Sequence, residues 1–203
     1  LYDYREGKAP NDTELAAANQ HIGADRIELT APDKVRFRDP RTRIDLGGIA
    51  KGYAIDQGIA LLKEAGVEHA YLSLGGDSYV LGDHRGRPWE VGIQHPRSKQ
   101  DIAMKLPMAN LAMSTSGDYQ RYFIQDGRRI HHILSPKTGK SIDGLASVTV
   151  LCDNSIDADA LSTSVFVLGA EKGLALINRL PETSAIIINR EGNVTYSNDL
   201  TGG

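Results

Sequence analysis

The chain has 203 residues, 40% of them hydrophobic and 24% charged, which is an ordinary composition for a globular domain and excludes intrinsic disorder. The net charge of −3 gives no support to nucleic acid as a partner, and the single Cys152 excludes a disulfide framework. No apolar run approaches the roughly 18 residues of a membrane span, and the first residues do not form a signal peptide. An opening without Met is typical of a fragment or a processed product.

The first third of the chain combines two helices and a hairpin. Asn11 and Glu14 form a capping-box pattern at the start of the first helix, and Gly23 follows its end. A Pro-Asp turn joins two short strands, and the glycine pair 47–48 precedes a longer amphipathic helix. In chain order, the predicted elements are a helix over 11–22, strands over 26–30 and 34–39, and a helix from after Gly48 to about Ala65.

The rest of the chain is rich in strands. Asp126-Gly127 is a strong hairpin signal, and the strand before Gly75-Gly76 reads as buried. The predicted strands are 69–74, 78–81, 89–94, 103–108, 111–114, 120–125, 128–134, 147–152, 184–190 and 194–197. The predicted helices are 156–168 and 171–179. Helices and antiparallel strands alternate without a regular strand–helix–strand rhythm, which predicts an α+β fold with a mixed, largely antiparallel sheet in a single domain over 1–203.

A glycine pair leads into a helix in the segment Asp45-Leu46-Gly47-Gly48-Ile49-Ala50-Lys51-Gly52-Tyr53. Free amides at a helix N-terminus attract phosphate, and Lys51 adds a positive charge in the first turn. The segment matches neither the P-loop pattern nor the dinucleotide-binding glycine pattern. Its alternative interpretation is a plain strand-to-helix turn with a solvated lysine.

A carboxylate and a hydroxyl stand one helical turn apart in the helix over 156–168. Asp159 and Thr163 share one face, because they are four residues apart. Oxygen ligands of this kind suit a hard cation such as Mg²⁺ or Ca²⁺. The alternative is an acidic first turn that complements the helix dipole, as Asp157 would also do.

Two further segments carry polar groups suited to chemistry. His131 and His132 are adjacent in a strand and point to opposite faces, so they cannot both enter one site; one of them is a candidate general base, and a structural role is the alternative. Ser116 and Gly117 belong to a hydroxyl-rich segment, 114–119, that we interpret as an anion-holding loop or as a simple turn. No serine-hydrolase elbow is present.

Taken in order, five stretches resemble the ApbE family of flavin transferases. They are DLGGIAKGYAID at 45–56, LSLGGD at 72–77, MSTSGDYQRYF at 113–123, HHILSPKTG at 131–139 and DADALSTSVFVLG at 157–169. The resemblance covers nearly the whole chain and corresponds to the C-terminal two thirds of the family's usual length. It implies an ApbE-like, T-fold-like domain that lacks the family's N-terminal segment, which helps to hold the flavin ring.

The resemblance implies Mg²⁺-dependent or Mn²⁺-dependent transfer of FMN from FAD to a Thr hydroxyl of a target redox protein, with release of AMP. The family's metal ligands map onto the Gly48 carbonyl, Asp159 and Thr163. Its FAD contacts map onto Asp45, Lys51 and the backbone at Leu134. In this interpretation, His132 or Asp157 is the general base, with His132 preferred. Ser135 replaces the Asp common in the family before that Pro, which puts a role for this side chain in doubt.

Two other functions use the same residues. An FAD pyrophosphatase would release FMN and AMP to water, and a non-catalytic module would bind FAD and leave it intact. The resemblance also implies location, because many members are exported lipoproteins that face membrane-bound redox partners. We therefore expect an extracytoplasmic, periplasmic protein anchored through a lipidated Cys upstream of residue 1, with the cytoplasm as the alternative.

Overall fold

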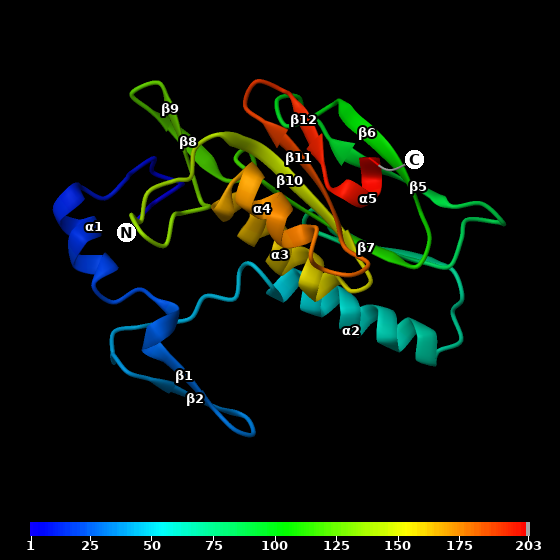
Figure 1. Ribbon diagram of the computed structural model, residues 1–203, viewed down its shortest axis with the longest axis horizontal. Coiled ribbons are helices and arrows are strands. Elements are labelled where there is room, and N and C mark those ends of the chain that lie inside the picture. The colour runs from blue at the N-terminus through cyan, green and yellow to red at the C-terminus, as the bar shows by residue number, and fades with distance from the viewer. Residues whose placement is uncertain (202–203) are drawn as a thin grey trace. The chain divides into compact units, whose positions relative to one another are not determined.

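The computed structural model describes residues 1–201, which form two compact units. Unit 1 consists of Leu1–Asp45 and Arg121–Ile142, and unit 2 consists of Leu46–Gln120 and the chain from Asp143 onward. Figure 1 shows the elements of both units. The expectation of a single domain over 1–203 stays a prediction. In the described part of the chain, no helix has the length and apolar character that a membrane crossing requires.

Unit 1 consists of short elements held by local hydrogen bonds. The capping box is present as predicted: the Asn11 side chain accepts from the Glu14 amide at 2.9 Å, and the Glu14 carboxylate accepts from the Asn11 amide at 2.8 Å. The two hairpins of the unit are antiparallel. The elements of unit 1 are α1 (Asp12–Asn19), the 3-10 helix η1 (Ala24–Arg26), β1 (Ile27–Thr30), β2 (Lys34–Phe37), β8 (Tyr122–Gln125) and β9 (Arg128–His131).

Unit 2 is built on a six-stranded sheet in the order β12-β11-β10-β7-β4-β3, and its strand pairs are antiparallel. The sheet strands are β3 (Ala70–Leu74), β4 (Asp77–Leu81), β7 (Leu111–Gly117), β10 (Leu145–Cys152), β11 (Ser184–Asn189) and β12 (Val194–Tyr196). The remaining elements are α2 (Ala50–Glu64), β5 (Trp89–Gln94), β6 (Ile102–Met108), α3 (Ser155–Leu168), α4 (Ala170–Ile177) and α5 (Asn198–Thr201). This arrangement confirms the predicted α+β class.

The two faces of the sheet bury different partners because side chains alternate along each strand. Tyr79 and Leu81 pack with Ile55 and Ile59 of α2, whereas Val80 between them packs with Ile93 of the β5–β6 hairpin. Helices α2 and α3 cover one face (Figure 1), and the hairpin covers part of the other. The face under the helices holds the candidate site.

Several element predictions differ from the structure, and α5 was not predicted. The helix expected over 11–22 ends at Asn19, because the chain turns at Gln20 and Gly23 has a φ of 150°. The strand expected to be buried over 69–74 is half-exposed, since β3 is the edge strand of its sheet. The segment 114–119 is no loop at its start, because β7 extends to Gly117 through its pairing with β10.

Candidate functional site

A lysine ammonium lies between two buried carboxylates under the helices of unit 2. The Lys51 Nζ donates to Asp77 Oδ2 at 2.5 Å and to Asp159 Oδ1 at 2.9 Å. Asp77 is 1% exposed and Asp159 is 2% exposed, so neither carboxylate is solvated by bulk water. Lys51 belongs to the first turn of α2, Asp77 opens β4, and Asp159 lies in α3. Three elements distant in the sequence thus bring opposite charges together.

The close approach of α2 to α3 positions Asp159. A Cβ at Gly52 would lie 2.1 Å from the carbonyl oxygen of Ser155, so only glycine allows this packing. The Gly52 amide donates to Asp159 Oδ2 at 3.1 Å. Asp56, one turn further along α2, accepts from the amides of Ser155 at 2.7 Å and Ile156 at 2.9 Å. These hydrogen bonds satisfy two amides in the first turn of α3, which have no partner within the helix. The glycine-rich start of α2 is therefore fitted to the start of α3.

A chain of hydroxyl groups connects Asp77 to Thr163. Ser114 Oγ donates to Asp77 Oδ1 at 2.7 Å and lies 3.2 Å from Ser162 Oγ. Ser116 Oγ lies 2.9 Å from both Ser162 Oγ and Thr163 Oγ1. Residues 114 and 116 point to the same face because they are two apart in β7. The result is a cluster whose side-chain acceptors are all oxygen atoms.

Burial and nearby charges shift the pKa values of Lys51 and Asp77 in opposite directions. Burial lowers the pKa of Lys51, but its hydrogen bonds and attraction to Asp77 and Asp159 outweigh burial, so the pKa is raised above its usual value. Burial raises the pKa of Asp77, although the hydrogen bonds from Lys51 and Ser114 oppose the rise. The lysine remains a cation at neutral pH, and it stabilises negative charge in a site with little water.

The donor set fits a hard divalent cation. Asp159 and Thr163 present a carboxylate and a hydroxyl one turn apart, and a Cβ at Gly48 would lie 3.8 Å from Thr163 Oγ1. Mg²⁺ typically takes one or two carboxylates and completes its shell with water and substrate phosphates. The described residues contain no group of three or more His, Cys, Asp or Glu suited to a metal, which is compatible with such a sparse protein shell.

The structure brings four of the seven predicted site residues into unit 2, namely Gly48, Lys51, Asp159 and Thr163. The other three, Asp45, His132 and Leu134, belong to unit 1. Asp45 is exposed, and Leu134 forms a backbone bridge with Ser141.

The strand expected over 128–134 ends at His131, so His132 lies just outside it, and the two adjacent histidines differ in burial. His131 is fully buried, with its Nε2 2.7 Å from the Ile142 carbonyl. His132 is exposed, and its Nδ1 lies 3.3 Å from the Arg121 carbonyl. His131 is therefore the structural member of the pair, and the accessible imidazole is that of His132.

Sequence reasoning missed the role of Asp77 and three of its neighbours. Asp77 appeared only as the last letter of the stretch at 72–77, and Ser114 and Ser162 were not singled out. Ser116 was expected in a loop, but it points from a strand toward Thr163. The available signal was the alternation of Ser114 and Ser116, which places both hydroxyls on one face of a strand.

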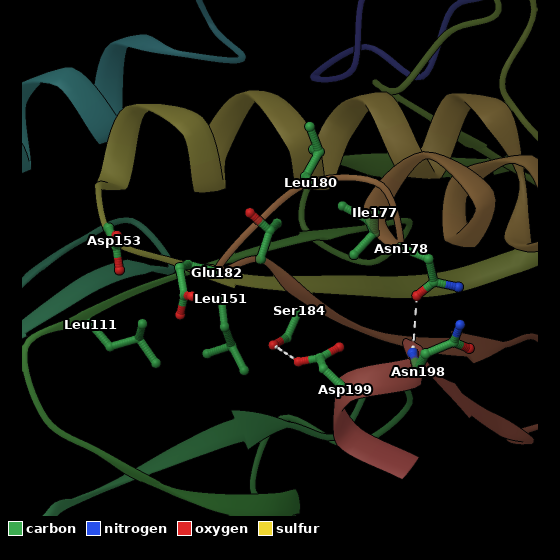
Figure 2. Close-up of a pocket in the computed structure, with 11 residues that line it drawn as sticks. Leu111, Leu151, Asp153, Ile177, Asn178, Leu180, Glu182, Ser184, Asn198 and Asp199 are labelled. Carbon is green, nitrogen blue, oxygen red and sulfur yellow. Dashed lines mark hydrogen bonds between the residues drawn. The ribbon is translucent and has the colours of Figure 1, made fainter. Parts of the chain in front are cut away.

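A cavity of about 390 Å³ lies away from this cluster, at the start of β7 and the end of β10. Figure 2 shows its lining, which includes Leu111, Leu151 and Asp199. The Asn198 amide donates to Asn178 Oδ1 at 2.9 Å, and Ser184 donates to Asp199. None of the predicted site residues lines this cavity.

Comparisons with known proteins agree on one family. The ApbE family model matches residues 1–188. The chain is 36% identical to the FAD:protein FMN transferase of Klebsiella pneumoniae, covering 85% of this chain and 56% of that protein. It is 35% identical to the same-named protein of Haemophilus influenzae, covering 95% of this chain and 58% of that protein.

Solved structures agree with the sequence comparisons. The ApbE protein of Thermotoga maritima superposes with a TM-score of 0.86 at 32% identity, covering 98% of this chain and 65% of that one. The apo flavinyl transferase ApbE of Pseudomonas stutzeri gives a TM-score of 0.80 at 34% identity, covering 95% and 61%. The chain thus spans little more than half the length of the curated relatives named here. With a family match over most of its length and a shared fold, the chain belongs to the ApbE family.

Proposed function

We propose that the chain catalyses Mg²⁺-dependent transfer of FMN from FAD to a Thr hydroxyl of a target redox protein. A bond forms between the Thr oxygen and the phosphorus of the FMN moiety, the pyrophosphate P–O bond breaks, and AMP leaves. The Thr proton passes to a general base. The observation that carries the proposal is the buried cluster in which Lys51 lies between Asp77 and Asp159.

The chemistry of the cluster suits this reaction. A pyrophosphate carries negative charge, and attack on phosphorus depends on positioning and charge stabilisation. Lys51 supplies a cation in a site of low solvent access, where a charge acts more strongly than in water. The names of the relatives, FAD:protein FMN transferase, agree with this substrate class.

In the proposal, the metal is held by the Gly48 carbonyl, Asp159 and Thr163. When bound, Mg²⁺ would neutralise pyrophosphate charge and stabilise the charge that develops during transfer. Lys51 binds a phosphate, and Gly52 keeps Asp159 oriented through its amide. The hydroxyl chain from Ser114 to Thr163 fixes the orientation of the Thr163 oxygen. Mn²⁺ suits the same oxygen ligands.

The proposal also assigns roles to residues of unit 1. Asp45 and the backbone at Leu134 contribute to FAD binding, and His132 accepts the Thr proton. A positioned base contributes roughly 10²–10⁴ in rate. The support for His132 over His131 is accessibility, since His132 is exposed and His131 is fully buried. Asp157 is the alternative base, and it is exposed on α3.

Mass spectrometry of an acceptor protein tests the proposal. We would incubate the chain with FAD, Mg²⁺ and an acceptor protein that carries a short Asp-Gly-Ser-Thr segment, with EDTA in a parallel sample. The expected result is a gain of one FMN unit and release of AMP, both abolished by EDTA. An acceptor that stays unmodified in the presence of Mg²⁺ contradicts the proposal.

Two alternatives give different products in the same experiment. An FAD pyrophosphatase releases FMN and AMP with no attached flavin, because water replaces the Thr hydroxyl. A non-catalytic module binds FAD and releases no AMP. Chromatography of the supernatant separates the two alternatives from each other and from transfer.

Cellular location is a separate proposal. We expect the protein to be extracytoplasmic, periplasmic and anchored by a lipid on a Cys upstream of residue 1, where it meets redox proteins at the membrane. Fractionation of cells that produce the full-length protein tests this expectation. Recovery in the cytoplasmic fraction would support the alternative location.

A further inference from the structure

A small polar cavity lies on the sheet face opposite the helices of unit 2. Its volume is about 150 Å³, and β3, β4, β5, β7 and the residues just after β7 contribute to its lining. None of the residues that line it is charged. Hydroxyl and amide groups dominate instead, including those of Ser73, Ser78, Thr115 and Gln120. Because its lining is uncharged, this cavity suits a neutral polar group, whereas the Lys51 cluster suits a phosphate.

Ser78 carries an unsatisfied hydroxyl in this cavity. Its side chain is buried, with 2% exposure, and its Oγ has no hydrogen-bond partner among the described residues. Buried hydroxyls are nearly always paired, because an unpaired one loses its hydration without compensation. The neighbouring hydroxyls are already engaged: Ser73 donates to the Asp77 carbonyl at 3.0 Å, and Thr115 pairs with Thr149 at 2.8 Å. The Ser78 hydroxyl is therefore left without a partner in the described chain, in a residue that lines the cavity.

The turn between β3 and β4 separates this cavity from the candidate active site. Gly76 lines the cavity, and a Cβ on it would lie 3.3 Å from the Gln120 amide nitrogen. A Cβ on the adjacent Gly75 would lie 3.3 Å from the Lys51 side chain. A molecule bound in the cavity is thus one tight turn away from the group that we assign to a phosphate.

The outer strand of the sheet offers a docking edge beside the cavity. β3 is the last strand in the sheet order, so its outer edge has no strand partner in the described chain. Tyr71 and Ser73 of β3 line the cavity, and Tyr71 is 49% exposed. An extended peptide can add to such an edge, with alternate side chains entering pockets. The volume of about 150 Å³ is below the range of about 300–1,000 Å³ that is typical of cofactor sites.

We propose that this cavity holds an uncharged hydroxyl or amide side chain of the acceptor protein, presented by an extended segment that lies along β3. The inference rests on the proposed function, which requires a protein as the second substrate. It names a binding site for that substrate on the opposite side of the sheet from the Lys51 cluster. Charged side chains are excluded because the cavity offers them no counter-charge.

A matched pair of serine variants tests the inference. Ser147 is also buried, at 1% exposure, and its Oγ is also without a partner in the described chain, but Ser147 does not line the cavity. The probe is a fluorescein-labelled peptide that contains an Asp-Gly-Ser-Thr segment, and anisotropy reports its Kd. Ser78→Ala should weaken peptide binding about tenfold by removing the hydrogen bond, whereas Ser147→Ala should change it less than about twofold.

Ser78→Leu fills the cavity and should abolish peptide binding. Gln120→Ala removes an amide from the cavity lining and should also weaken peptide binding, and its exposed position avoids interference from loss of folding. The Kd for FAD should not change in any of these variants, and thermal unfolding confirms that each is folded. The inference is overturned if Ser78→Ala and Gln120→Ala both bind the peptide as Ser147→Ala does. It is equally overturned if the wild type binds no peptide, or if FAD affinity falls instead.

The peptide-binding readout separates the two proposals. If peptide binding responds to Ser78→Ala but the acceptor gains no FMN, then transfer fails and the cavity assignment stands. If transfer proceeds and the acceptor KM is the same for Ser78→Ala and Ser147→Ala, then the cavity assignment fails alone.

Discussion

The two units of this chain differ in where their polar side chains lie and in what these side chains contact. In unit 2, the carboxylates of Asp77 and Asp159 are buried beneath two helices and are neutralised by Lys51. In unit 1, polar side chains mainly cap turns near the surface, as Asn11 and Asp39 do. The difference follows from core size, because a buried charge needs surrounding elements that exclude water and supply partners.

The two units also differ in how far they bury their strands and apolar side chains. All eight residues of β10 in unit 2 are buried. In unit 1, Leu29 is 79% exposed and Phe37 is 42% exposed. Unit 2 therefore has a buried core around its Lys51 cluster, whereas His132 of unit 1 is exposed. Variants in each unit test this division.

Asp159→Asn should lower the rate of FMN transfer about 100- to 1,000-fold, because it removes a charge from the site that we assign to metal and phosphate. Asp157→Asn is the matched control, since Asp157 lies two residues earlier in α3 but is exposed. The two rates are compared by mass spectrometry of the acceptor. If Asp159→Asn transfers FMN at the wild-type rate, the reaction lies outside the unit 2 cluster. A loss in Asp157→Asn alone would identify Asp157 as the base.

His132→Ala should slow transfer roughly 100-fold with little change in thermal stability, whereas His131→Ala should chiefly destabilise the protein. The reason is that His131 is fully buried and contacts the Ile142 carbonyl, while His132 is exposed. Transfer rates and melting temperatures separate the two effects. If His132→Ala transfers FMN at the wild-type rate, unit 1 does not supply the base.

Gly52→Ala should destabilise the protein by about 3 kcal/mol, because the new Cβ would meet the backbone of α3 and force the helices apart. Gly58→Ala on the same helix should be nearly neutral. Its Cβ would meet only the flexible end of Leu72 at 2.7 Å, and alanine favours a helix by about 1 kcal/mol over glycine. Chemical denaturation measures both, and equal stabilities would refute the close packing that we assign to Gly52.

Lowering the pH should loosen unit 1 at Asp39. A hydrogen bond from the Arg41 amide and another with His21 hold the pKa of Asp39 at about 2, below its ordinary value of 3.8. Because the folded-state pKa is depressed, the stabilisation is present above about pH 4 and is lost as the pH falls through about 2. Amide hydrogen exchange around residue 39 should therefore accelerate in that range. Asp39→Asn should exchange rapidly already at pH 5, and a wild-type rate in this variant would refute the assignment.

Local signals in the sequence predicted many of the elements well. The cap at Asn11, the turn at Asp126-Gly127 and the strand over 89–94 agree with the structure, because each depends on neighbouring residues. The predictions fail where a segment distant in the sequence determines the length or the burial of an element. β7 extends through Ser116 since β10 pairs with it, and β3 is half-exposed since no strand covers its outer edge in the described chain.

By itself, the sequence determined the α+β class and the one-turn spacing of Asp159 and Thr163. These properties follow from the helical and strand periods, which are local. Only the tertiary structure brought Asp77 and Ser114 to Lys51 and Asp159, because their contacts join residues that are 26 to 108 positions apart. Such contacts depend on strand order and on the approach of α2 to α3, which no local pattern specifies.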